Sequence, residues 1–198
     1  MREALKMGRS TGDDTVSTLV AAARQCFAST GVRGTRMDDI ARAAGLSRQA
    51  VYRYVSGRED LVELVIIERC REFASEAEAA MPAATTEVPV AMTDVLVHLI
   101  AAARADQEFG MLASAMPRVR LNLLLSSASS PVHQMLGDCF ATLFERGHRE
   151  GLLRTDITRR ETVEWLQGVL MTYVPRVDLD VTEVRRFVHE FAVRSLLA

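Results

Sequence analysis

The sequence predicts an all-α protein, and three observations carry that prediction. Apolar residues recur at helical spacing in nearly every segment, no segment shows the alternation of a half-buried strand, and capping residues or prolines stand at most segment ends. The chain has 198 residues, of which 48% are hydrophobic and 25% charged. These fractions are typical of a folded chain that buries its own core, so disorder is excluded. We expect about nine or ten helices.

The first helices are short and clearly delimited. Residues 1–12 are charged and are expected to form a mobile arm, after which a helix runs from near Asp14 to Gly31. Thr35 and Asp38 have the spacing of a capping box for a helix over 37–44, and Ser47 caps a third helix over about 48–55. A longer helix is expected to begin at about residue 58 and to end near residue 80.

The remaining chain repeats this pattern at greater length. Helices are expected from Pro89 to about residue 105, over about 107–116 and over about 117–125. A long helix follows Pro131 and ends at Gly151. Thr158 and Glu161 form a capping box for the next helix, over 158–175, and a last helix begins at about residue 180.

The segment over 37–55 carries the sharpest functional signal, because two short helices flank Gly45, a residue that tolerates a left-handed turn. This is the pattern of a helix-turn-helix that places its second helix in the DNA major groove. Arginine can bond guanine and glutamine can bond adenine at base edges, while other polar side chains contact phosphates. The predicted DNA-binding residues are Thr35, Arg36, Ser47, Arg48, Gln49, Tyr52, Arg53, Tyr54 and Arg58.

The charge distribution agrees with this placement. The formal net charge is −2, yet residues 1–70 hold 11 basic and 9 acidic residues, and the rest of the chain is acidic. Arginine supplies all but one of the basic residues, the exception being Lys6. A mildly basic first third is what a DNA-facing domain needs. The spacing of the motif residues alone also fits an ordinary helical hairpin with arginines on its surface, so that alternative stays open.

Residues 15–62 resemble the N-terminal domain of the TetR family of bacterial transcription regulators. The resemblance rests on the order and spacing of Ala22, Ala23, Phe27, Gly31, Thr35, Ile40, Ala41, Ala44, Gly45, Ser47, Val51, Tyr52, Tyr54, Arg58, Glu59 and Leu61. The sequence departs mildly from the family pattern: Val55 stands where an aromatic residue is common, Cys26 replaces a leucine, and Arg58 replaces a lysine.

The resemblance implies a DNA-binding domain over 1–57, a connecting helix over 58–81, and a larger ligand-binding and dimerisation domain over 82–198. It implies a homodimer that pairs through the helices near 131–150 and 158–175 and binds near-palindromic operator DNA. It also implies a cytoplasmic bacterial repressor, associated with the nucleoid when bound to its operator and released by a small-molecule effector. A regulator controlled by a protein partner, or one that acts constitutively, stays open as the alternative.

The second domain offers candidates for a mostly apolar effector pocket: His98, Phe109, Met111, Met116, Trp165 and Tyr173. Each could equally be a core or interface residue, and His98 could be a hydrogen-bonded core histidine. The other three histidines, His133, His148 and His189, have polar neighbours and are expected at the surface.

Several classes of function are excluded or disfavoured. The sequence shows no nucleophile elbow, glycine-rich phosphate loop or paired catalytic carboxylates, so we expect neither an enzyme nor a cofactor. No His, Cys, Asp or Glu spacing suggests a metal site, and three scattered cysteines make no disulfide framework. The sequence has no stretch of about 20 apolar residues, so we expect no membrane partner.

Overall fold

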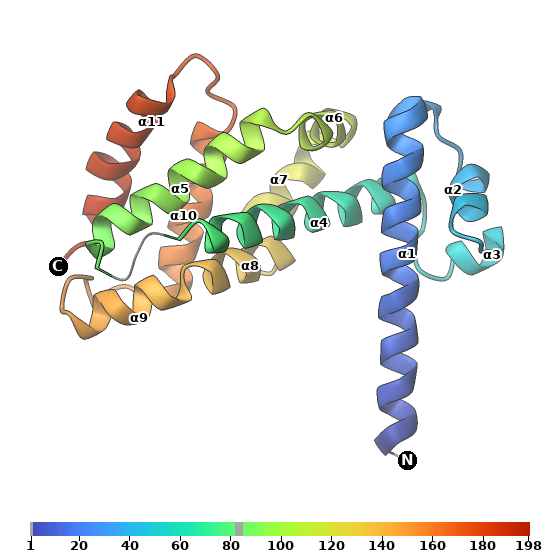
Figure 1. Ribbon diagram of the computed structural model, residues 1–198, viewed down its shortest axis with the longest axis horizontal. Helices are drawn as coiled ribbons and strands as arrows, with labels where there is room; N and C mark the ends of the chain where they lie inside the picture. The colour runs from blue at the N-terminus through green and yellow to red at the C-terminus, as the bar shows by residue number, and fades with distance from the viewer. Residues whose placement is uncertain (1, 82–84) are drawn as a thin grey trace. The chain divides into compact units, whose positions relative to one another are not determined.

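The computed structural model describes the backbone of residues 2–81 and 85–198, and the side chains of 14–81 and 85–198. It divides into two compact units (Figure 1). Unit 1 comprises residues 1–68 and 111–117, and unit 2 comprises 69–110 and 118–198. The division falls inside the segment predicted to connect two domains. Residues 111–117 belong to unit 1 although they follow 69–110 of unit 2 in the chain, which the sequence did not suggest.

Unit 1 is built on helix α1, Arg2–Gly34, with α2, Met37–Ala43, α3, Arg48–Val51, and the start of α4, Arg58–Ala79. Helix α1 begins at Arg2, so the backbone of the predicted arm is helical there, and Met1 lies outside the described residues. Gly31 interrupts the helix as expected, with φ 71° and ψ 160°. The core is apolar and includes Leu19, Ala23, Phe27, Ile40, Ala41, Val51, Val55, Leu61 and Val65.

The connection between α1 and α2 differs from the predicted capping box. Asp39, rather than Asp38, accepts a hydrogen bond from the backbone N–H of the residue that precedes α2, Arg36, at 3.3 Å. Thr35 is turned inward and its hydroxyl donates to the carbonyl oxygen of Gly31 at 2.8 Å. Only this half of a capping box forms, one residue later than predicted, because Thr35 is used to close the end of α1 and the Arg36 side chain has no acceptor.

Unit 2 consists of helices joined by short turns. After α5, Val88–Ala105, and α6, Gln107–Ala115, come α7, Arg118–Ser126, α8, Pro131–Cys139, α9, Ala141–Arg149, and α10, Arg159–Tyr173. Residues 111–115 of α6 belong to unit 1. The chain ends in α11, Val181–Phe187, the π-helix η1, Val188–Val193, and the 3-10 turn η2, Arg194–Leu196. Helix α5 contacts α9, α10, α11 and η1, and its stripe of Met92, Val95, Leu96, Leu99 and Ile100 is buried as expected (Figure 1).

The predicted single helix from Pro131 to Gly151 is two helices. The break lies at Phe140, where ψ is −2°. The carbonyl oxygen of Gly137 accepts a hydrogen bond from Arg159 Nη2 at 2.6 Å, and the same guanidinium lies over the Phe144 ring. Because a side chain of α10 takes this carbonyl, it competes with the helical bond that would carry α8 onward. The pattern of apolar residues could not show this contact.

A half-buried ion cluster joins the second half of α4 to the α5–α6 corner. Arg69 Nη2 lies 2.6 Å from Asp106 Oδ2 and Nε lies 3.6 Å from Glu108, while Nη1 pairs with Glu72. The guanidinium also lies 4.6 Å from the ring centroid of Phe73. These half-buried charges are compensated by one another, and the cluster links the three helices within unit 2.

Candidate functional site

The helix-turn-helix of unit 1 presents polar side chains on one short, well-defined helix. Gly45 has φ +66°, so the turn between α2 and α3 uses the left-handed conformation that glycine adopts without steric cost. Ser47 caps α3, since its Oγ accepts a hydrogen bond from Ala50 N–H at 3.1 Å. Val51 and Ile40 are fully buried and hold α3 against the rest of unit 1.

Helix α3 is shorter than predicted. It ends at Val51, and the chain continues through a turn in which the N–H groups of Arg53 and Tyr54 bond back to Ala50 and Val51. The side chains over 47–49 and 52–54 are nonetheless exposed, as a DNA-reading surface requires. Arg36 and Arg58 are also exposed, and Arg58 donates to the carbonyl oxygen of Arg33 at 3.0 Å.

Arg48 is the most constrained of these side chains. Its guanidinium lies 5.5 Å from the Tyr52 ring centroid, and Nη1 lies 3.0 Å from Asp38 Oδ1. The contact with Tyr52 and the negative charge of Asp38 raise the pKa of Arg48. Like any arginine, it is a cation at physiological pH. A permanently charged, oriented guanidinium suits the guanine edge in the major groove.

Thr35 is the predicted DNA-binding residue that the structure places elsewhere. It is 4% exposed, and its hydroxyl is also 3.2 Å from the Cys26 carbonyl oxygen and 2.9 Å from Thr30 Oγ1. A hydroxyl committed inside unit 1 does not reach a phosphate, so the Thr35 side chain fixes the α1–α2 turn instead. The motif position could not distinguish these roles, since a cap and a phosphate contact use the same atom.

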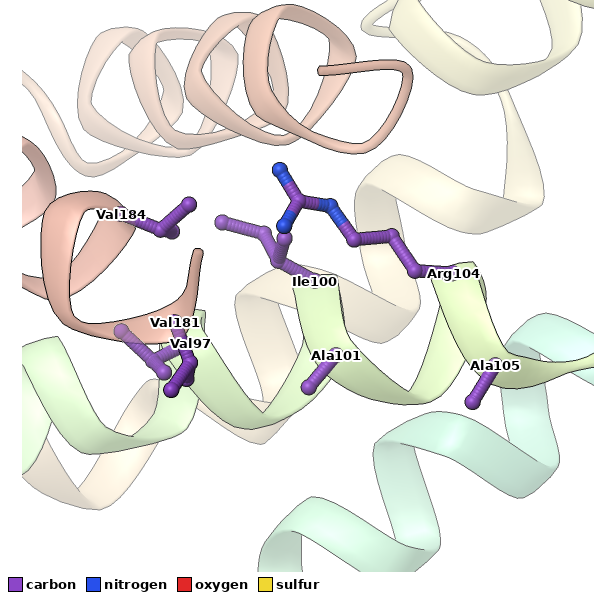
Figure 2. A pocket seen from close by; sticks show the side chains of 7 residues that line it. All are labelled: Val97, Ile100, Ala101, Arg104, Ala105, Val181 and Val184. Atoms are coloured by element: carbon purple, nitrogen blue, oxygen red, sulfur yellow. The ribbon is translucent and has the colours of Figure 1, made fainter. Parts of the chain in front are cut away.

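An apolar pocket of about 300 Å³ lies between α5 and α11 in unit 2. Figure 2 shows its lining: Val97, Ile100, Ala101, Arg104, Ala105, Val181 and Val184. Arg104 donates to the carbonyl oxygens of Tyr173, Arg176 and Leu179 at 2.5 to 3.0 Å, so it holds the α10–α11 connection in place. The volume is at the lower end of the range for small-molecule sites.

None of the six residues predicted for an effector site lines this pocket. Met111 and Met116 belong to unit 1. Within unit 2, Phe109 packs on Phe73 with ring centroids 5.7 Å apart, and Tyr173 stacks on Phe187 at 6.3 Å. Trp165 is half-exposed and donates to the Ala192 carbonyl oxygen, while the buried Nε2 of His98 has no hydrogen-bond partner among the described residues. The predicted residues therefore lie in separate surroundings, which helical spacing alone could not reveal.

Two histidines expected at the surface are half-buried and make polar contacts with other helices. His133 Nδ1 lies 2.6 Å from Gln167 Oε1, and His189 Nδ1 lies 3.0 Å from Thr93 Oγ1. His148 is exposed as predicted. The polar sequence neighbours of these two histidines did not indicate their surroundings, because the hydrogen-bond partners of both come from helices distant along the chain.

Over 14–81 and 85–198, no group of three or more His, Cys, Asp or Glu side chains could hold a metal ion. Helix α5 is long and apolar enough, by length and composition alone, to cross a membrane. Half of that stretch is buried among the other helices, which is the pattern of a core helix.

An all-helical chain whose first unit presents a helix-turn-helix defines the class of DNA-binding transcription regulators. Residues 19–65 match the family model described as bacterial regulatory proteins, tetR family. The N-terminal domain thus belongs to the tetR family, and the chain as a whole has the fold of TetR-family transcription regulators.

Solved structures with the same fold span the whole chain. A TetR-family regulator from Pectobacterium atrosepticum is 19% identical, with coverage of 96% of this chain and 97% of that one and a TM-score of 0.68. The repressor QsdR from R. erythropolis is 15% identical over 94% and 97%, also with a TM-score of 0.68. AlkX from Dietzia sp., a TetR-family repressor implicated in n-alkane biodegradation, is 16% identical over 90% and 95%, with a TM-score of 0.62. No curated protein matches the sequence.

Proposed function

We propose that the protein is a homodimeric repressor that binds operator DNA in the cytoplasm and is released by a small, mostly apolar effector. The observation that carries the DNA-binding part is the capped α3 helix with its exposed polar side chains on a tetR-family domain. The proposed contact residues are Arg36, Ser47, Arg48, Gln49, Tyr52, Arg53, Tyr54 and Arg58. Arg48 and Gln49 stand in the first turn, nearest the base edges, and the others are placed for phosphates.

The DNA-binding proposal is tested with a duplex that carries the sequence upstream of the protein's own gene. Arg48→Ala and Tyr52→Ala should each weaken binding, by about fivefold to a hundredfold for the base-reading arginine. Arg149→Ala is the control, because it removes an exposed arginine from unit 2. Binding of the wild type should fall steeply with salt as phosphate contacts are lost. Folded Arg48→Ala and Tyr52→Ala proteins that bind unchanged would overturn the assignment.

The exposed apolar side chains indicate where two copies pair. Trp165 on α10 is 46% exposed and Phe191 on η1 is 67% exposed, and these elements are in contact because Trp165 Nε1 donates to the Ala192 carbonyl oxygen at 3.2 Å. Exposed aromatic side chains on elements in contact are typical of an interface. In the segment over 131–150, by contrast, Leu136, Phe140, Leu143 and Phe144 are buried in the core of unit 2.

We therefore keep α10 as a dimer helix and propose α11 with η1, in place of the segment over 131–150, as its companion. Phe191→Glu and Trp165→Glu should convert the dimer into a monomer, as measured by light scattering on a sizing column. Leu123→Glu is the matched control, because Leu123 on α7 is 62% exposed, between Trp165 and Phe191. If the control dissociates the protein and the other two variants remain dimeric, the interface lies elsewhere.

The pocket between α5 and α11 is the proposed effector site. Its aliphatic lining suits an apolar molecule, and its volume suits one of about ten carbon atoms, since a cavity of about 150 Å³ holds benzene. An effector must prefer the state that does not bind DNA, because equal affinity for both states shifts nothing.

Naphthalene, decanol and decanoic acid are suitable probes, with thermal unfolding and release from DNA as readouts. Ala101→Trp should fill the pocket and abolish the response, because Ala101 lines it from α5. A response to a probe that survives Ala101→Trp would place the effector elsewhere. A regulator that responds to none of the probes would favour control without a small molecule.

A further inference from the structure

Two charged side chains meet on the outer face of the helix-turn-helix. Asp38 lies in the first turn of α2, and Arg48 is the first residue of α3. Both oxygens of the Asp38 carboxylate accept hydrogen bonds from Arg48 Nη1, at 3.0 and 3.1 Å. The carboxylate binds Nη1 alone, so Nε and Nη2 lie outside this pair.

Stability does not account for this pair, because both side chains are exposed and such pairs contribute little to folding. The pair instead restricts the direction in which the Arg48 side chain points. An arginine side chain has several rotatable bonds, and its freedom must be lost before it can read a base. Here Asp38 holds one nitrogen and Tyr52 lies beside the guanidinium, so much of that freedom is already removed.

A carboxylate at this place also has a cost for DNA binding. It adds negative charge to the face that meets phosphates, and so lowers affinity for DNA of any sequence. Specific recognition commonly combines an attractive contact for the right partner with a repulsive one for the wrong partners. Asp38 supplies both features, because it orients the base-reading arginine and disfavours binding that lacks the arginine–guanine contact.

We infer that Asp38 is a specificity-determining, positioning residue that holds Arg48 for a guanine in each operator half-site. This inference rests on the proposed DNA-binding function. Asp38 need not touch DNA, since it acts through Arg48. A plain structural role is the competing explanation, because an acidic residue in the first turn of α2 also favours the helix dipole.

Asp39 provides a control that separates the two explanations. It stands in the same first turn of α2, but its carboxylate bonds to Arg36 N–H and pairs with Arg42 at 3.4 Å. Asp38→Asn and Asp39→Asn therefore remove the same charge from the same helix turn. Asp38→Asn alone removes the ionic partner of Arg48.

The experiment begins with selection from a pool of random duplex DNA by the wild-type protein and by the two asparagine variants. Binding is then measured by fluorescence anisotropy for three duplexes: the selected consensus, the same duplex with its arginine-dependent G·C pair changed to A·T, and an unrelated sequence. The wild type should discriminate G·C from A·T by at least about tenfold. Asp38→Asn should reduce this to a few-fold and bind the unrelated duplex more tightly.

Asp39→Asn should keep the wild-type discrimination. Arg48→Lys, which keeps the charge but loses the planar fork, should also abolish discrimination, and Asp38→Asn added to it should change discrimination no further. Unchanged discrimination in folded Asp38→Asn, equal loss in Asp39→Asn, or additive effects in the double variant would overturn the inference while leaving the proposed function intact. A wild-type protein that enriches no sequence would overturn the proposed function itself, and the inference with it.

Discussion

The half-buried His133 and the buried Gln167 form a hydrogen bond in which Nδ1 and Oε1 are 2.6 Å apart. The amide nitrogen of Gln167 donates to the Leu125 carbonyl oxygen at 2.8 Å, so Oε1 is the acceptor and His133 carries a proton on Nδ1. Gln167 is 1% exposed, and this one side chain joins α7, α8 and α10. Buried amides of this kind specify an arrangement of helices because each bond has one matching partner.

Replacing Gln167 tests this network. Gln167→Leu keeps the size of the side chain but leaves a buried carbonyl oxygen and a ring nitrogen without their partner, which should lower the free energy of unfolding by about 1–3 kcal/mol. Gln134→Leu, at an exposed position of α8, should change it by less than about 0.5 kcal/mol. Urea unfolding at neutral pH measures both. Equal stability of Gln167→Leu and the wild type would show that the network does not hold the helices.

Close packing at Gly147 leads to a second prediction. A Cβ atom there would lie 2.6 Å from Leu153 Cδ1 and 3.2 Å from Val88 Cγ1. Gly147→Ala should therefore destabilise the protein by about 1–3 kcal/mol, since overpacking a core forces side chains from their rotamers. Gly110→Ala, on α6 with no atom within 4 Å of its Cβ, should instead stabilise by about 0.5–1 kcal/mol. Thermal unfolding of the two variants and the wild type measures both effects. A Gly147→Ala protein that is more stable than the wild type would contradict the close packing at Gly147.

The three cysteines are expected to be unreactive in the folded protein. Burial raises the pKa of the Cys70 and Cys139 thiols to about 12, and burial followed by the nearby Asp39 charge raises that of Cys26. The thiolate is the reactive form, so a disulfide reagent at pH 8 should label none of them quickly, whereas all three should react in urea. Rapid labelling of one native thiol would instead identify a candidate redox sensor.

The capping box of α10 gives a pH-dependent prediction. Glu161 Oε2 accepts hydrogen bonds at 2.7 Å from the N–H and the hydroxyl of Thr158, and these bonds lower the pKa of Glu161 below its ordinary value of 4.5. A lowered folded-state pKa means that the contribution to stability is complete above pH 4.5 and is lost as pH falls through the folded value.

The measurement is the free energy of unfolding of the wild type and Glu161→Gln between pH 3 and pH 7. The difference between the two proteins should be constant near neutral pH and should shrink below the ordinary glutamate pKa. A difference that does not depend on pH would show that the Glu161 carboxylate does not act as a charged cap.

Much of this fold can be predicted from the sequence where the signal is local. The start of α10 follows from Thr158 and Glu161, the turn before α3 from Gly45, and the cap of α3 from Ser47, because each depends on residues a few positions apart. The break at Phe140 could not be predicted in this way, since Arg159 of another helix takes the Gly137 carbonyl oxygen.

The candidate site divides in the same way. Exposure of Arg48, Gln49 and Tyr52 follows from the helical period of the recognition segment, whereas burial of Thr35 depends on the end of α1 folding back against it. Apart from Arg104, the pocket between α5 and α11 is lined by aliphatic residues that no pattern distinguishes from ordinary core residues. Which of them pack together depends on the order of helices in space.

The sequence by itself determined that this protein is all-helical and carries a helix-turn-helix of the tetR family, because periodicity, caps and motif spacing are written within short segments. The tertiary structure alone decided that Thr35 is a buried cap, that His133 and Gln167 are partners, and that Asp38 holds Arg48. The last two relationships join residues of different helices, and a hydrogen bond or ion pair depends on distances that chain separation does not fix.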